Sequence, residues 1–336
     1  MAPTRLLSLV SSFAIIAATA LPAVAADAPL VAFAQEGLYN SWRTANNDSI
    51  LAEGKKAGYK IQWVQADGDQ SKQVAQVQDL LKLKPKLLIV EPAEQQAATP
   101  IAALAEAAGV PLIVADRGLG VPAGKGQYKI LIEVDWKAVG VELGKAAVET
   151  LKKKKGAPAG NVVELVGTVG STPQIGMDEG FKSVTAAYPD IKVIDTQDGH
   201  NERAKGLSIM ENFLTAHPAG QIDLVFAQND EMAIGALKAI QAAGRDELLG
   251  TIISKDGQLE AVKELASGNF AADCTNTPYF GPILMPYVKD ILDGKAVPTN
   301  PPKPFVCLSS LTDQGKGEAQ ALVKDMTAQK MAFAPR

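Results

Sequence analysis

Histidine and cysteine are scarce in this chain of 336 residues, which contains two of each. The histidines, His200 and His217, have no cysteine or carboxylate pattern around them, so we expect no metal site. Charge of one sign is not in large excess either, because 33 Lys and Arg stand against 37 Asp and Glu, a formal net charge of −4. This balance argues against a nucleic-acid-binding surface, and we expect no nucleic-acid partner.

Long hydrophobic runs are absent after the N-terminus. Arg5 precedes an apolar run from residue 6 to about 20, and Ala23-Val24-Ala25 forms an A-x-A cleavage pattern. These features predict a signal peptide over residues 1–25, with an uncleaved membrane anchor as the alternative. We therefore expect a soluble mature protein in the periplasm.

The two cysteines allow at most one disulfide. In an oxidising compartment Cys274 and Cys307 could pair and close a loop of about thirty residues. Two buried free thiols are the alternative, and the sequence does not decide between them.

Short apolar runs alternate with longer amphipathic runs along the whole chain. The run LLIVEP precedes an expected helix at 99–108, for example, and the alternation restarts at residue 161 with NVVELVG. Continuously apolar strands indicate parallel sheets that helices cover on both faces. The sequence therefore predicts an α/β protein with two lobes.

The boundaries of these lobes follow from the two successive series of expected strands and helices. We expect residues 1–25 to be removed, 26–135 plus about 276–298 to form the N-terminal lobe, and 136–275 plus about 303–336 the C-terminal lobe. The proline-rich stretch KAVPTNPPKP is expected to be a stiff connector between them, with a PxxP recognition motif as the alternative.

Polar residues follow most of the expected strands. In open parallel sheets, ligands bind outside the carboxyl ends of the strands. Two sheets that face each other would therefore line a cleft with these side chains: Gln35, Asp67, Glu91, Asp116, Asp135, Asp198, Asp230 and Asp256.

A glycine-rich loop lies in the segment NVVELVGTVGSTPQIGMDEGF, residues 161–181. A strand, a glycine-rich turn and a helix often form a phosphate site. However, the spacing fits neither G-x-G-x-x-G nor G-x-x-x-x-G-K-[ST], and no lysine follows to reach a phosphate. We expect the loop to let the backbone approach another polar ligand, and we expect no cofactor.

Five stretches together resemble one protein family over nearly all of the expected mature chain. They are AFAQEGLYNSWR, the Asp-Arg of VADRG, VELVGTVGSTPQIGMDEGF, FAQNDEMAIGALKAI and the Asp-Gly of ISKDG. The chain resembles the sugar-binding periplasmic proteins of ABC importers, in the ribose-binding group, and most closely the galactofuranose-binding branch. The resemblance implies a type I periplasmic binding protein, with two Rossmann-like lobes and parallel sheets joined by a three-crossover hinge.

Nine positions are implied as ligand contacts. Asp and Asn accept hydrogen bonds from sugar hydroxyls, Arg and Asn donate them, and an aromatic ring covers an apolar face. The candidates are Asn40, Trp42, Arg43, Asp116, Arg117, Met177, Asn201, Asn229 and Asp256, with Gln35 and Tyr39 as lesser candidates.

Several of these residues also have a purely structural interpretation. Asp116 and Arg117 could be a self-paired surface pair, and Trp42 could be part of the core. Asn229 could cap the helix that follows it, and Asp256 could be a turn residue before Gly257.

Two positions depart from the family pattern. Relatives usually carry an arginine at the position of Met177, and ribose binders tend to place an aromatic at that of Asn201. Losing a charged donor removes roughly 1.5–3 kcal/mol of hydrogen bonding. The ligand is therefore expected to be less hydroxylated there, a deoxy sugar or polyol, or to lie outside the sugars.

The expected role is that of a monomeric, non-catalytic receptor. It would capture a sugar or polyol by hinge closure and deliver it to an ABC permease in the inner membrane. A sensory receptor for chemotaxis or a sensor kinase is the first alternative. An exported sugar-active enzyme is the second, although no Ser–His or Cys–His arrangement is visible.

Overall fold

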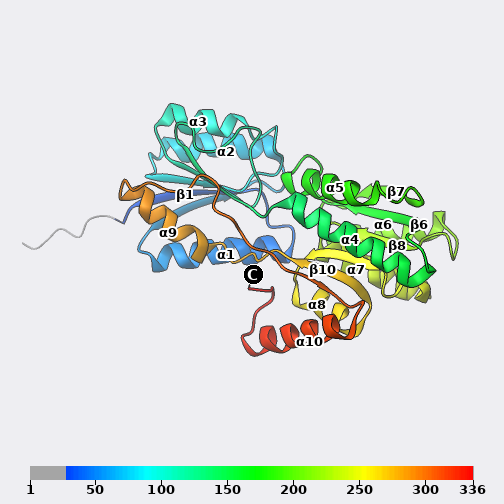
Figure 1. Cartoon of the computed structure of the whole chain (residues 1–336). Helices are drawn as coiled ribbons and strands as arrows, with labels where there is room; N and C mark the ends of the chain where they lie inside the picture. Colours follow the sequence, from blue (N-terminus) through cyan, green and yellow to red (C-terminus); the bar gives the residue numbers. More distant parts are fainter. Residues whose placement is uncertain (1–27, 336) are drawn as a thin grey trace, which may run out of the picture.

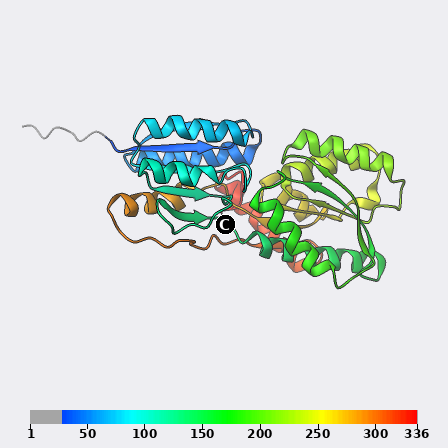
Figure 2. The same cartoon turned by 90° about the horizontal axis from the view of Figure 1, so that it is seen from above.

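The computed structural model describes residues 28–335, which form two α/β lobes side by side (Figures 1 and 2). The expected signal peptide, residues 1–25, lies outside the described residues. Among residues 28–335, no helix combines the length and the apolar character that a membrane crossing requires. The two lobes confirm the predicted fold class.

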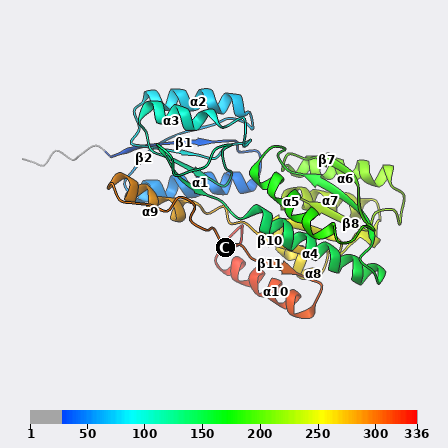
Figure 3. The ribbon, with the colours of Figure 1, turned by 45° about the horizontal axis from the view of Figure 1, so that its top comes forward.

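The first lobe contains a parallel sheet in the order β2-β1-β3-β4-β5. Helices α2 and α3 cover one face and α1 and α9 cover the other (Figure 3). The elements are β1 (Leu30–Gln35), α1 (Ser41–Lys56), β2 (Lys60–Gln65), α2 (Gln70–Lys82), β3 (Leu87–Val90), α3 (Pro100–Ala108), β4 (Leu112–Ala115), β5 (Tyr128–Ile132) and α9 (Gly281–Leu292).

The second lobe contains a sheet in the order β11-β10-β9-β8-β6-β7. Helices α4 and α5 cover one face, and α6, α7, α8 and α10 cover the other. The elements are α4 (Trp136–Lys155), β6 (Gly160–Val166), α5 (Thr172–Thr185), β7 (Ile191–Asp198), α6 (Arg203–Ala216), β8 (Leu224–Ala227), α7 (Asp230–Ala242), a 3-10 turn (Asp246–Leu248), β9 (Ile252–Asp256), α8 (Leu259–Ser267), β10 (Phe270–Thr275), β11 (Cys307–Ser309) and α10 (Asp313–Ala328).

The burial of the strands explains their sequences. The central strands β3, β4 and β8 are buried at every residue, because helices cover both faces, and they read as continuous apolar runs. The edge strands β2 and β7 contain no fully buried residue and expose several side chains to solvent. Their sequences, KIQWVQ and IKVIDTQD, accordingly mix polar and apolar residues.

One strand departs from the predicted parallel arrangement. Strand β11 pairs antiparallel with β10, with Cys307 opposite Cys274. The physical reason is its route, because the chain reaches β11 from the other lobe and enters this sheet at the end where the parallel strands finish. The two cysteines form a disulfide across this pair, and no free cysteine occurs in the described part of the chain.

Three segments connect the lobes. The chain crosses between β5 and α4, between β10 and α9, and between α9 and β11. The last crossing contains the proline-rich stretch, which therefore is a connector as predicted, and it lies beside the first crossing where Val134 pairs with Lys303. These crossings place the carboxyl ends of both sheets on either side of one pocket.

Candidate functional site

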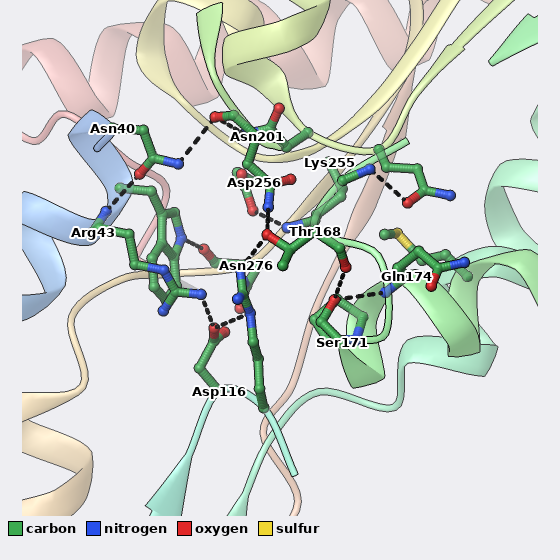
Figure 4. Close-up of a pocket in the computed structure, with 17 residues that line it drawn as sticks. Asn40, Arg43, Asp116, Thr168, Ser171, Gln174, Asn201, Lys255, Asp256 and Asn276 are labelled. Atoms are coloured by element: carbon green, nitrogen blue, oxygen red, sulfur yellow. Dashed lines mark hydrogen bonds and ion pairs between the residues drawn. The ribbon is translucent and has the colours of Figure 1, made fainter. Parts of the chain in front are cut away.

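A pocket lies between the lobes, at the carboxyl ends of both sheets (Figure 4). All nine residues predicted as ligand contacts line it. They are Asn40, Trp42, Arg43, Asp116 and Arg117 from the first lobe, and Met177, Asn201, Asn229 and Asp256 from the second. The pocket is thus built by side chains that are far apart in the sequence and come from both sheets.

Arg43 is the centre of a buried ion-pair network on the first-lobe side. Its Nε lies 2.7 Å from Glu36 Oε1, its Nη1 3.1 Å from Glu91 Oε2, and its Nη2 2.7 Å from Asp116 Oδ2. All three nitrogens therefore have carboxylate partners. Arg43 therefore fixes the position of Asp116, and its guanidinium nitrogens are already paired within the protein.

The network also sets the charge of its carboxylates. Burial opposes ionisation of Asp116, but Arg43 and Arg117 beside it hold its pKa below the usual value. Burial raises the pKa of Glu91 to about 7, with Arg43 opposing the rise. Asp116 is therefore a charged hydrogen-bond acceptor at the pocket.

Arg117 is the clearest donor on this side. Its Nη1 lies 3.1 Å from the Ala93 carbonyl oxygen and 3.3 Å from Glu36 Oε1. Its Nε is buried and has no hydrogen-bond acceptor among the described residues, since Asp116 Oδ2 is 3.8 Å away. Asp116 and Arg117 are 3 % and 4 % exposed, so the interpretation of these two residues as a self-paired surface pair is wrong.

Trp42 belongs to the core and to the pocket at once. Its Nε1 donates to the Asn276 carbonyl oxygen at 2.7 Å, and its ring packs edge-on against Phe280. The guanidinium carbon of Arg43 lies 4.7 Å from its ring centroid. The ring is therefore fixed before any ligand arrives, and its stacking on a sugar stays a prediction.

Helix caps position two of the amide side chains. Asn40 caps α1 through Oδ1, which accepts from the Arg43 backbone N–H, and its Nδ2 donates across the cleft to the Asn201 carbonyl oxygen at 3.1 Å. Asn229 caps α7 by accepting from the Met232 N–H at 3.0 Å. The capping interpretation of Asn229 is thus correct, and the same residue also lines the pocket.

The glycine loop allows the backbone to approach its neighbours closely. A Cβ on Gly167 would lie 2.6 Å from Asn201 Oδ1, so only glycine fits there without movement. Asn201 has a positive φ of 60° and donates through Nδ2 to Thr168 Oγ1 at 3.0 Å. Met177, one turn into α5 from Pro173, is 1 % exposed and gives the pocket an apolar wall.

Asp256 terminates β9 with an unusual backbone φ of 135°. Its Oδ1 accepts from Lys255 Nζ at 2.8 Å. Burial raises its pKa, and Lys255 opposes the rise. It precedes a glycine as the turn interpretation requires, yet it also faces the pocket.

Several lining residues were not named as contacts from the sequence, although the glycine-rich loop that begins with Gly167 and Thr168 was expected to approach a ligand. They are Gly167, Thr168, Ser171, Pro173, Gln174, Gln228, Lys255 and Asn276. Gln228 and Lys255 each precede a predicted contact by one position, where the alternation of side chains along a strand gives no reason to expect a second contact. The lesser candidates Gln35 and Tyr39 do not line the pocket, because Gln35 bonds Asn46 and Glu91 and Tyr39 bonds Glu36.

Most of the strand-end acids also lie elsewhere. Of the eight strand-end residues, only Asp116 and Asp256 line the pocket. Asp67 and Asp198 are exposed because they follow the edge strands β2 and β7. Within residues 28–335, no group of three or more potential metal ligands is present.

The fold and this interlobe pocket define a two-lobed binding protein of the α/β class. A family model described as periplasmic binding protein domain matches residues 31–296, and the chain belongs to this family.

Individual relatives agree with this assignment. The ribose import binding protein of Escherichia coli strain K12 is 34% identical over 274 residues, which cover 82% of this chain and 87% of the relative. The galactofuranose-binding protein of the same organism is 31% identical, covering 77% and 81%. A Mycobacterium smegmatis protein solved in complex with β-D-fucofuranose superposes with a TM-score of 0.81 at 30% identity, covering 90% and 96%.

Proposed function

We propose that this chain is the solute-binding component of an ABC importer and captures an uncharged monosaccharide or polyol between its lobes. The observation that carries the proposal is the pocket at the carboxyl ends of both sheets, which hydrogen-bond donors and acceptors line from both lobes. A sugar hydroxyl needs both kinds of partner because it donates and accepts. The relatives named for ribose and galactofuranose support a sugar as the ligand class.

The charges at the pocket favour an uncharged ligand. Arg43 is paired with Asp116, and Lys255 with Asp256. A charged ligand would leave an unmatched charge in a buried site, which is unfavourable. The free Nε of Arg117 and the amides then serve hydroxyl groups.

Contacts between the lobes support capture by closure. The Gln95 N–H donates to the Gly170 carbonyl oxygen at 2.9 Å, and Ser41 Oγ donates to Glu231. A ligand that contacts both lobes stabilises this closed arrangement relative to an open one. The closed form would then dock on a permease in the inner membrane.

The lobe boundaries that we propose are 26–135 with about 276–298, and 136–275 with about 303–336. In support, Phe280 and Leu284 pack in the core of the first lobe, and Ala319 and Met326 pack in that of the second. In this proposal the protein acts as a monomer in the periplasm and has no catalytic activity.

Isothermal titration calorimetry tests the proposal with D-ribose, L-arabinose, D-galactose, D-fucose and xylitol. At least one should bind, and Arg117→Met should weaken it at least about tenfold, since a hydrogen bond to a charged donor is lost. Small-angle scattering should show a smaller radius of gyration with bound ligand. Binding of none of the five, or binding without compaction, would contradict the proposal, and turnover of glycosides would contradict its non-catalytic part.

A further inference from the structure

Lys255 is a buried cation in a pocket that otherwise presents few free charges. It lies on β9 immediately before Asp256, is 8 % exposed, and lines the pocket (Figure 4). Nothing in the alternation of the sequence marked it as a ligand contact. Burial of a lysine is unfavourable unless its ammonium group has partners.

The ammonium group has fewer partners in the protein than it has hydrogens. Nζ donates to Asp256 Oδ1 at 2.8 Å and lies 5.2 Å from the centroid of the Trp136 ring. Asp256 supplies the only hydrogen-bond acceptor for Nζ in the part of the chain that the structure describes. Since an ammonium group has three N–H donors, at least one remains for a ligand oxygen.

The same wall of the pocket has an apolar part. Met177 packs with Trp136 in one buried cluster, and Lys255 Nζ lies over that tryptophan ring. Pro173 and Met177 are four residues apart on α5 and therefore share one face of the helix. Both line the pocket, as does Lys255, so one ligand can meet a charged donor, a thioether and a pyrrolidine ring there.

We propose that Lys255 and Met177 together select a deoxy monosaccharide, an inference that rests on the proposed function. Lys255 donates to a single hydroxyl or ring oxygen of the sugar, and Met177 contacts an adjacent carbon that lacks a hydroxyl. A lysine is a point donor, whereas the planar fork of an arginine reads two neighbouring oxygens. A hydroxyl placed against Met177 would be buried without a hydrogen-bond partner, which is unfavourable.

Matched sugar pairs test this selection by calorimetry. The pairs are D-galactose with its 6-deoxy form D-fucose, and D-ribose with 2-deoxy-D-ribose. In at least one pair the deoxy member should bind the wild type at least about fivefold more tightly, because its partner carries an unpaired hydroxyl. D-Galacturonate is included as a charged probe and should bind more weakly than D-galactose.

Three variants separate the roles of the two residues. Lys255→Met should weaken every bound sugar at least about tenfold, the effect of losing one charged donor. Lys255→Arg keeps the charge but replaces a single ammonium donor by a planar guanidinium that can donate to two neighbouring oxygens. This variant should shift the binding preference within each pair toward the hydroxylated sugar. Met177→Gln places a polar group on the wall and should shift it in the same direction, which loss of packing alone would not do.

The results distinguish three outcomes. If no sugar binds the wild type, the proposed function fails and this inference fails with it. If sugars bind but Lys255→Met changes no affinity by more than about twofold, Lys255 is not a ligand contact. If the hydroxylated member is preferred in both pairs, or if galacturonate binds most tightly, selection of a deoxy sugar is wrong. Circular dichroism and melting temperature confirm that each variant is folded.

Discussion

The two sides of the pocket are built by different means. The first-lobe side is charged and interlocked, with Arg43 bound to three carboxylates. The second-lobe side has one ion pair, Lys255 with Asp256, and an apolar part, Pro173 and Met177. Its other polar side chains are uncharged amides and hydroxyls, namely Thr168, Ser171, Gln174, Asn201, Gln228 and Asn229. Side chains in one ion-pair network depend on each other, whereas side chains fixed by local backbone structure can be changed one at a time.

The lobes also differ in what stabilises them near the site. In the first lobe, Arg43 is about 3 % exposed and joins three buried carboxylates in one network. The second lobe also buries charged side chains near the site, among them Lys255 and Asp256, but as a separate pair. The second carries the disulfide between Cys274 and Cys307 at the edge of its sheet. Variants in the first lobe should therefore change stability and binding together, and variants in the second should separate the two.

The largest effect is expected from Arg43→Met. It leaves Glu36, Glu91 and Asp116 buried without their shared cation, so the free energy of unfolding should fall by about 3–5 kcal/mol. Urea denaturation followed by circular dichroism measures this loss.

Arg203→Met in the second lobe is the matched control. Arg203 also pairs with two carboxylates, Glu231 and Glu260, but its side chain is 32% exposed. Its loss should change stability by less than about 1 kcal/mol, because solvent screens such pairs. Equal losses for the two variants would refute the contrast between the lobes.

The next largest effect should come from removing the disulfide. The cysteines are 33 residues apart, and opening a loop of that size is expected to destabilise by about 3–4 kcal/mol through the entropy of the unfolded chain. Cys274→Ala with Cys307→Ala should therefore lower the urea midpoint. Sugar affinity should change little, because neither residue lines the pocket.

Wild-type protein treated with dithiothreitol provides the comparison for this double variant. Under reducing conditions the wild type should lose stability and approach the double variant, whose own midpoint should not respond to the reductant. A wild-type midpoint insensitive to dithiothreitol, at a concentration shown to free both thiols, would contradict this stabilising role.

A smaller effect is expected at the first crossing between the two lobes. Glu133 accepts a hydrogen bond from Thr172 Oγ1 at 2.8 Å, and burial raises its pKa to about 7. Between the ordinary carboxyl pKa and this value, the folded protein keeps a proton that the unfolded chain has lost. Its contribution to stability is therefore full at low pH and is lost as the pH rises from about 4.5 to about 7.

Glu133→Gln tests this pH dependence. Glutamine keeps the shape without the ionisation, so near pH 8 the variant should be more stable than the wild type by about 1–3 kcal/mol. The difference should shrink toward pH 4.5, where both side chains are neutral. Urea titrations across this range measure it, and a difference independent of pH would show that Glu133 does not carry the proton.

The fold was largely predictable from the sequence because buried parallel strands have a distinctive composition. Runs such as LLIV and LVFA are covered by helices on both faces and became β3 and β8. The antiparallel β11 was not predicted. Its direction depends on the route of the third crossing, which local composition does not specify.

Pocket residues at the ends of interior strands could be predicted from the sequence. Residues whose orientation depends on local backbone geometry could not. Asp116 and Asp256 follow interior strands and line the pocket, whereas Asp67 and Asp198 follow edge strands and do not. Lys255 was missed because an alternating strand gives no reason for two successive residues to face one pocket. The backbone φ of 135° at Asp256 departs from a regular strand and accompanies this arrangement.

The smallest effect on stability, and the one that best separates capping from binding, concerns Asn229. Asn229→Ser keeps an oxygen that can accept from the Met232 N–H, so stability should change by no more than about 0.5 kcal/mol. It removes the amide donor, so the affinity for a bound sugar should fall about fivefold to tenfold. Asn229→Ala should show the same loss of affinity and a further loss of about 1 kcal/mol in stability.

Calorimetry measures the affinity of each Asn229 variant for sugar, and urea denaturation measures its stability. If Asn229→Ser bound sugar as tightly as the wild type, Asn229 would act only as a helix cap, and the second-lobe side would contact the ligand through its other residues.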